Sequence, residues 1–258
     1  MVDIDISPDF GPQLLRGRIR NLRKIRRNRD FVFTAADRAK MGATAITAGL
    51  AGLGGVATGL SGMAIDTTEE ADLLEFDLDG KPIRAWVWQS VFNEGDEVEV
   101  VAEQAETHWQ GYGLYRPGDA IVALHPHCSR GRYAHYRAAF RIYLKCVVPL
   151  LIATLTMIFG VGYSMDGSKS IMVLVNVFPE LLGGTVASAL IFGGIAYSVS
   201  RKLMGFVKLA EGIFEGFGWH NVKSIDLPAS TKRSKEPGDP AALGVLYFRY
   251  SDAQPDKE

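Results

Sequence analysis

Two long stretches without a charged side chain constrain this chain more than any other feature of its sequence. One runs from Cys146 to Met165 and the other from Leu181 to Ser200, and each contains twenty residues. A helix of this length crosses about 30 Å of hydrocarbon. We therefore predict two transmembrane helices that form a hairpin over residues 146–200. The second helix is expected to begin near Pro179, and residues 171–178 either extend it or lie in the membrane interface.

Basic side chains flank this hairpin on its two outer sides, whereas the short connection between the helices carries only Lys169, beside Asp166 and Glu180. Lys and Arg close to a membrane span stay on the cytoplasmic side. We therefore predict two spans with both termini in the cytoplasm. In the basic juxtamembrane segment 128–145 and just after the second span, we expect contacts with anionic lipid head groups. These residues are Arg130, Arg132, Arg137, Arg141, Lys145, Arg201 and Lys202.

Residues 66–127 have a different sequence pattern, in which short runs with alternating apolar residues are separated by turn residues. The runs are LLEFDL, IRAWVW, DEVEVVAE, THWQGYGLY and DAIVALH, and the breaks include DGKP, NEGD and RPGD. Gly, Pro and Asp in these breaks are typical of tight turns. Five strands with hairpin-length connections predict a small antiparallel barrel of the OB or SH3 kind. The fold class is therefore an α+β membrane protein.

The C-terminal residues 201–258 are predicted to be cytoplasmic and to begin with an amphipathic helix. Apolar residues recur there at helical spacing, and the helix is expected to end near Gly216–Gly218. They are Leu203, Phe206, Val207, Ala210, Ile213 and Phe214. The stretch STKRSKEPGDP is predicted to be a charged loop, and GVLYFRY a last strand that can complete the sheet of the barrel.

The N-terminal arm, residues 1–40, is strongly basic although the whole chain has a net charge of −1. Eight of the fourteen residues from Arg16 to Arg29 are Lys or Arg, whereas residues 66–106 are mostly acidic. The arm fits either a strand or a helix, and its charge suits lipid head groups or nucleic acid phosphates. The membrane tether favours lipid, and a solvated topology signal is the alternative. The lipid-contact residues predicted here are Arg16, Arg18, Arg20, Arg23 and Lys24.

A glycine-rich apolar segment occupies residues 41–65, which carry no charge. A dinucleotide loop would need a preceding strand, which is not predicted. A third span would place the basic flanks of the later hairpin on the outer side, against the charge rule. We therefore expect a helical segment that docks on the membrane face, re-enters the membrane, or joins copies of the protein. The glycines expected to permit close helix packing are Gly49, Gly52, Gly55, Gly59, Gly183 and Gly184. For the last two, simple helix flexibility is the alternative.

The chemistry-bearing residues predict neither a metal site nor an enzyme. His125, His127 and Cys128 resemble zinc ligands, but no fourth donor follows at a finger-like spacing. The two cysteines, Cys128 and Cys146, do not suggest a disulfide framework. The sequence contains no nucleophile elbow, HExxH motif or Walker lysine, so no catalytic residue and no cofactor are expected.

Three stretches of the chain resemble one family of bacterial, mostly proteobacterial, membrane proteins described as type VI secretion system effectors. They are RGRIRNLRKIRRNRDFVFTAADRAKMG, HPHCSRGRYAHYR and AEGIFEGFGWHNVKSIDLP, and the resemblance extends from about Leu15 to Tyr250. It implies an inner-membrane location and a link to contact-dependent toxin delivery, and it carries over no catalytic residue.

This resemblance leaves three roles open: an accessory protein that acts by binding, an immunity protein against a membrane-active toxin, and a membrane-perturbing effector. The expected partners are the lipid bilayer, a second copy of the chain, or another protein of the secretion locus. Nucleic acid is not an expected partner.

Overall fold

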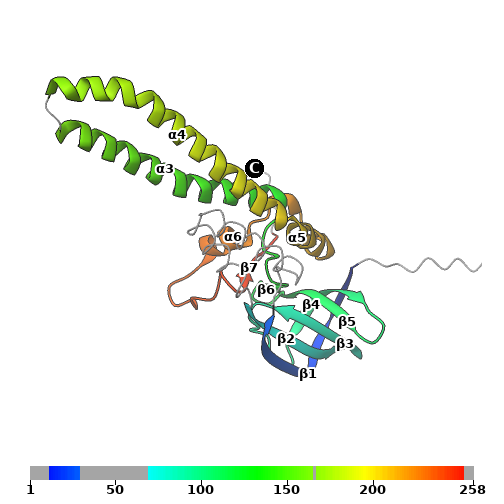
Figure 1. The fold of residues 1–258 in the computed structure, drawn as a ribbon. Helices are drawn as coiled ribbons and strands as arrows, with labels where there is room; N and C mark the ends of the chain where they lie inside the picture. Colours follow the sequence, from blue (N-terminus) through cyan, green and yellow to red (C-terminus); the bar gives the residue numbers. More distant parts are fainter. Residues whose placement is uncertain (1–11, 30–68, 165–166, 253–258) are drawn as a thin grey trace, which may run out of the picture.

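A closed β-barrel forms the body of the structure, and a hairpin of two long helices projects from it (Figure 1). The computed structural model describes residues 12–29, 69–164 and 167–252. The strands are β1 (Gln13–Arg29), β2 (Glu69–Leu78), β3 (Lys81–Val87), β4 (Glu97–Gln104), β5 (Trp109–Arg116), β6 (Ile121–Leu124) and β7 (Phe248–Arg249). The helices are α3 (Arg132–Ser164), α4 (Gly167–Lys202), α5 (Met204–Gly216), η1 (Val222–Ser224) and α6 (Leu227–Ser234).

Five strands close the barrel in the order β1-β2-β3-β5-β4, and β4 pairs back to β1. Four of the five pairings are antiparallel, but β3 and β5 pair in parallel. The sequence predicts an antiparallel barrel from residues 66–127, with GVLYFRY as a last strand that can complete its sheet. The structure differs because the basic arm supplies β1, which lies between β2 and β4 and buries Leu15 and Ile19 in the core.

The long strand β1 contains a β-bulge, which explains why its sequence fits both a strand and a helix. The pairing with β2 shifts register between Arg20 and Arg23, and Asn21 adopts a left-handed conformation with φ of 55°. A bulge inserts one extra residue and so changes the face on which later side chains lie. Ile19 therefore points into the barrel, whereas Ile25 packs in a separate cluster with Leu73. Of the two conformations that the arm fits, the structure contains the strand.

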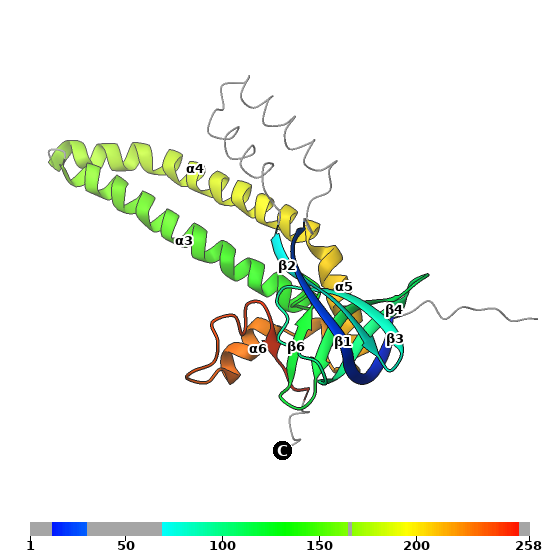
Figure 2. The ribbon, with the colours of Figure 1, turned by 90° about the horizontal axis from the view of Figure 1, so that it is seen from below.

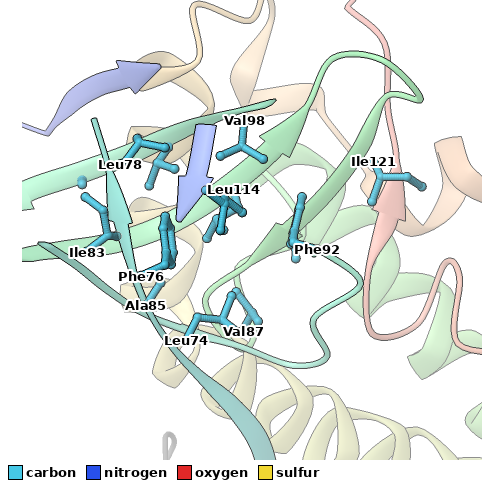
Figure 3. Packing of buried hydrophobic residues seen from close by; sticks show 14 of the residues in the cluster. Leu74, Phe76, Leu78, Ile83, Ala85, Val87, Phe92, Val98, Leu114 and Ile121 are labelled. Atoms are coloured by element: carbon cyan, nitrogen blue, oxygen red, sulfur yellow. The ribbon is translucent and has the colours of Figure 1, made fainter. Parts of the chain in front are cut away.

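The barrel core contains inward side chains of all five strands together with residues of β6 and of the chain before β7. Figure 3 shows part of this core. Leu74, Ile83 and Leu114 are almost wholly buried, as the alternation in their strands predicts. Phe92 comes from the connection between β3 and β4 and is also fully buried. This connection therefore contributes an aromatic side chain to the barrel core.

A second cluster lies on the outside of the barrel, where α5 covers β4 and β6. Val207, Ala210, Ile213 and Phe214 of α5 are buried, and the last three pack with Val101. The predicted amphipathic helix and its end near Gly216 are confirmed. The helix thus joins the hairpin to the barrel (Figure 2).

The remaining C-terminal elements differ in part from the prediction. The strand β7 has two residues and pairs with β6 beyond the closed barrel, so it extends the sheet and does not close it. Part of the expected charged loop is the helix α6, whose N-terminus is capped by the Asp226 carboxylate accepting from the Ala229 N–H. A carboxylate at this position satisfies a free backbone donor, and Pro228 suits the first turn.

Both helices of the hairpin are longer than their uncharged runs. The helix α3 has 33 residues and begins at Arg132, so most of the predicted juxtamembrane segment is helical. The helix α4 has 36 residues and begins at Gly167, which confirms that residues 171–178 extend it and places Pro179 inside it. By length and composition the stretches Arg132–Met157 and Leu182–Lys202 can each cross a membrane.

Candidate membrane-anchoring site

The hairpin is fastened to the barrel through an ion pair at its base. Arg132, the first residue of α3, donates from Nε and Nη2 to the Glu211 carboxylate of α5, and the Nη2–Oε2 distance is 2.6 Å. The Arg132 backbone N–H also donates to this carboxylate, at 2.8 Å. Glu211 is only 5% exposed, so these hydrogen bonds satisfy a buried charge. Arg132, predicted to contact lipid, therefore has a structural role here.

A second set of contacts joins the start of α3 to the chain that follows α5. Arg130 donates from Nε to the Asp226 carboxylate at 3.0 Å, and the Gly131 N–H donates to the Ile225 carbonyl at 2.9 Å. Together with the Arg132–Glu211 pair, they hold the beginning of α3 and the end of α4 beside the barrel. Both ends of the hairpin therefore lie on the same side of any membrane that it enters.

Glu211→Gln is expected to destabilise the protein at neutral pH and to change its acid sensitivity. Burial raises the pKa of Glu211, but hydrogen bonds from Arg132 and the charges of Arg132 and Lys223 outweigh burial, so the pKa lies below its ordinary value. A depressed folded-state pKa stabilises the fold above the unfolded pKa, and this stabilisation disappears as pH falls through the folded pKa.

We expect Glu211→Gln to lower the free energy of unfolding by about 2 kcal/mol at pH 7, because a buried group loses charged hydrogen bonds. The difference from the wild type should close as pH falls below the ordinary glutamate pKa of about 4.3. Denaturant unfolding in detergent micelles between pH 3 and 7 measures this, and exposed Glu215 in the same helix provides the control Glu215→Gln. A difference that stays constant across this pH range would contradict the assignment.

Two polar contacts set the register of α3 against α4. His135 Nε2 lies 2.8 Å from Ser200 Oγ, and the Tyr143 hydroxyl donates to the Ala189 carbonyl at 3.0 Å. The α3 residues between His135 and Tyr143 are therefore level with the uncharged run of α4. We call this part of the hairpin, residues 132–147 of α3 and 189–202 of α4, the root.

The root is basic on one side and apolar on the other. Arg137, Arg141 and Lys145 are exposed, form no ion pair with another described residue, and follow one another four positions apart. At 100° per residue, each lies about 160° around α3 from the nearer in sequence of the two residues that bond to α4, His135 and Tyr143. At the same level most exposed side chains of α4 are apolar, including Leu190 at 72% and Ile191 at 63% exposure. The predicted lipid-contact role suits this basic stripe, which has no competing partner within residues 12–29, 69–164 and 167–252.

The basic residues of β1 behave differently because β1 lies between two acidic strands. Arg20 and Lys24 are exposed and form no ion pair with another described residue. The other three residues with a predicted lipid contact pair with carboxylates of neighbouring strands: Arg16 with Glu99 at 2.8 Å, Arg18 with Glu97 at 2.7 Å, and Arg23 with Glu75 at 3.5 Å. At these three positions the positive charge of the arm is therefore compensated on the barrel surface.

Arg201 and Lys202, the basic pair after the second uncharged run, form the C-terminal end of α4. Arg201 lies over the Tyr197 ring, with 5.9 Å between the guanidinium carbon and the ring centroid. Lys202 is the last residue of α4 and is exposed. An aromatic ring beside a basic side chain is typical of the boundary between hydrocarbon and head groups.

Among the glycines with a predicted packing role, Gly183 and Gly184 meet no described side chain. An added Cβ at either position would have no described atom within 4 Å, whereas at Gly193 it would lie 3.6 Å from the Tyr143 hydroxyl. Gly193 is therefore one position at which a side chain of α3 approaches α4 closely. Gly49, Gly52, Gly55 and Gly59 lie outside the described residues. The residues that flank that segment, Arg29 and Glu69, pair directly across β1 and β2.

The possible metal ligands are engaged in separate contacts. His127 Nε2 lies 2.8 Å from a Glu69 carboxylate oxygen, and its ring packs edge-on against Trp88. His125 Nδ1 lies 3.2 Å from the Pro126 carbonyl oxygen. Cys128 is buried, which raises the pKa of its thiol. The described part of the chain holds no group of three His, Cys, Asp or Glu residues that could hold a metal ion.

A groove of about 580 Å³ lies between the root and the barrel. At the barrel end it is lined by Trp88, His127, Ser129, Arg130 and His135, and along the helices mainly by small and apolar side chains. Sequence reasoning missed this groove because its residues come from three distant parts of the chain. The only local signal is the cluster of polar and basic residues between β6 and the uncharged run of α3.

Comparison with known protein families, curated proteins and solved structures finds no match to this chain.

Proposed function

We propose that this protein is a membrane-anchored binding module, in which the hairpin holds the barrel at the cytoplasmic face of a bacterial inner membrane. One observation carries the proposal: α3 and α4 leave large apolar side chains uncovered along stretches long enough to cross a membrane. Phe140, Ile152 and Met157 of α3 are each more than half exposed, at 59%, 58% and 72%. Such a surface is unfavourable in water and favourable in hydrocarbon.

The barrel supports a binding role. Its strand order β1-β2-β3-β5-β4 with a parallel β3–β5 pair corresponds to the OB fold, whose members bind ligands on the barrel face and on its connecting loops. A nucleic acid ligand would require an uncompensated basic surface. Because carboxylates pair with Arg16, Arg18 and Arg23, we prefer a protein or lipid partner instead. The proposed activity is binding, and no catalytic role is assigned.

The resemblance in sequence supports association with a type VI secretion locus. A resident accessory role is preferred to that of a delivered effector because the apolar side chains of α3 and α4 are uncovered. A protein that travels through water would have to shield them. An immunity role shares this membrane location, and it differs from an accessory role in the identity of the partner.

Reporter fusions test the anchoring and its orientation. A reporter after residue 258 is expected to be active in the cytoplasm, and one inserted at residues 166–169 in the periplasm. The protein should also remain in the membrane fraction after alkaline carbonate washing. Release by carbonate would contradict anchoring by the hairpin, and a periplasmic C-terminus would contradict the orientation. Cytoplasmic activity at residues 166–169 would show that the hairpin enters the membrane without crossing it.

A further inference from the structure

The groove between the root and the barrel has two chemically different parts. Its wall along the helices includes Ile142, Leu150, Phe192, Ile195 and Val199. Its barrel end contains one formal positive charge on Arg130 together with two histidines, and no acidic side chain is among the described residues that line it. The groove therefore suits a molecule with an apolar chain and an anionic head.

The bilayer is expected to extend to the root, so the groove opens at the level of the head groups. The two stretches apolar enough to cross a membrane, Arg132–Met157 and Leu182–Lys202, are in register, because His135 is level with Ser200 and Tyr143 with Ala189. Both stretches include the root. Trp88 at the barrel end fits this level, since tryptophan favours the boundary between hydrocarbon and water.

Arg130 has hydrogen-bonding capacity for a phosphate. Its Nε donates to the Asp226 carboxylate at 3.0 Å, and this contact holds the guanidinium at the barrel end of the groove. A guanidinium carries five N–H groups, and four of them belong to the two Nη atoms. Neither Nη atom of Arg130 has a hydrogen bond to another described residue. They can therefore donate together to two phosphate oxygens, which is a favourable geometry for arginine.

Small residues leave the space in which an acyl chain could lie. Ala138, Ala139 and Ala196 line the groove beside the larger apolar side chains. The exposed basic stripe of α3 points away from α4 and is not part of the groove, so it can attract anionic lipids in general without selecting one.

We propose that this groove binds one anionic phospholipid from the bilayer, with its phosphate at Arg130 and an acyl chain along Ile142, Leu150 and Ile195. This inference rests on the proposed membrane anchoring. It assigns a defined lipid site to the junction of the hairpin and the barrel, separate from the basic stripe. A lipid at this site would contact both parts of the molecule and would stabilise their junction.

Native mass spectrometry of the full chain in a non-ionic detergent tests this site, with added phosphatidylglycerol or phosphatidylcholine as the probe. The wild type is expected to retain one phosphatidylglycerol with about tenfold preference over phosphatidylcholine, because both lipids carry the phosphate but phosphatidylcholine adds a quaternary ammonium that the Arg130 charge repels. Ala196→Phe should fill the groove and lower phosphatidylglycerol binding about tenfold. Ala187→Phe makes the same change at an exposed position of α4 outside the groove, and it should leave binding unchanged.

Arg130→Gln and Arg137→Gln separate the site from general attraction to anionic lipids. Arg130→Gln should remove the preference for phosphatidylglycerol, whereas Arg137→Gln, in the basic stripe, should preserve it. Equal binding of the two lipids to the wild type, or unchanged binding to Ala196→Phe, would overturn the proposal. Unchanged lipid binding with an altered oligomeric mass in Ala196→Phe would show that a second copy occupies the groove. Carbonate extraction of the same variants from membranes tests the anchoring separately. Lipid binding measured in detergent does not depend on whether the hairpin is anchored in a membrane.

Discussion

Phe214→Ala is expected to lower the free energy of unfolding by about 3–5 kcal/mol, the range for truncating a fully buried phenylalanine. Phe214 lies on α5 with no exposed surface, in the cluster that joins this helix to β4 and β6. Its ring also stacks on Trp219 at 5.4 Å between centroids. The change would leave a cavity at the only helix that connects α4 to the barrel within residues 12–29, 69–164 and 167–252.

Denaturant unfolding in detergent micelles, followed by tryptophan fluorescence, measures this loss because Trp219 lies beside the altered site. Phe140→Ala provides a matched control, since Phe140 is 59% exposed on α3 and its removal leaves no buried cavity. The control should cost less than about 1 kcal/mol. Equal losses in the two variants would show that α5 does not depend on this cluster for its attachment.

Gly131→Ala is expected to destabilise the junction of hairpin and barrel by about 3 kcal/mol, at the upper end of the usual cost of overpacking. A Cβ at Gly131 would overlap the carbonyl oxygen of Val222 and would lie 2.7 Å from the carbonyl carbon of Lys223. Both obstacles are backbone atoms, so no side-chain rotation can relieve the contact. The backbone of η1 would have to move away from the start of α3, which weakens the adjacent Arg130–Asp226 contact.

Gly212→Ala is the control for this substitution. An added Cβ at Gly212 of α5 would have no described atom within 4 Å, apart from its own helix backbone and chain neighbours. Alanine is a better helix former than glycine, so this variant should be stabilised by up to about 1 kcal/mol. Thermal unfolding of both variants in micelles gives the comparison. A Gly131→Ala variant as stable as the wild type would mean that the η1 backbone can move away from α3 without a loss of folding free energy.

Sequence reasoning succeeded where the signal is local. The uncharged runs of α3 and α4 show their length directly, and the spacing from Val207 to Phe214 shows the buried face of α5. Such periodic patterns depend on one element and its general surroundings. They do not identify the elements that become neighbours.

For the strand β1, local patterns in the sequence did not distinguish a strand from a helix. Leu15, Ile19, Leu22 and Ile25 have helix-like spacing, but the bulge at Asn21 produces that spacing within a strand. One pairing signal was present in the sequence: a strongly basic stretch and a strongly acidic stretch can neutralise each other as adjacent strands. The ion pairs from β1 to β2 and β4 are of this kind.

The groove depended on contacts that no local pattern contains. The pairing of Tyr143 with Ala189 sets which part of α4 faces the basic residues of α3, and the sequence does not specify this register. Trp88 reaches the groove from the barrel, and Arg130 reaches it from the connection before α3. The basic composition of this connection predicts that it lies near a membrane surface. The position of Arg130 in the groove could be seen only in the structure.

The cluster beneath α5 also has a consequence for the order of events during synthesis. Val101, Val122 and Leu124 precede the hairpin in the chain, whereas their partners Ile213 and Phe214 follow it. At about 5–20 residues per second, a ribosome needs on the order of ten seconds to proceed from Leu124 to Phe214. During that interval the barrel has an uncovered apolar patch, and both helices of the hairpin are synthesised before α5 can return to cover it. Covering of this patch therefore requires the hairpin to bring α5 back to the closed barrel, and a chain in which α5 does not return keeps a patch that chaperones and proteases recognise.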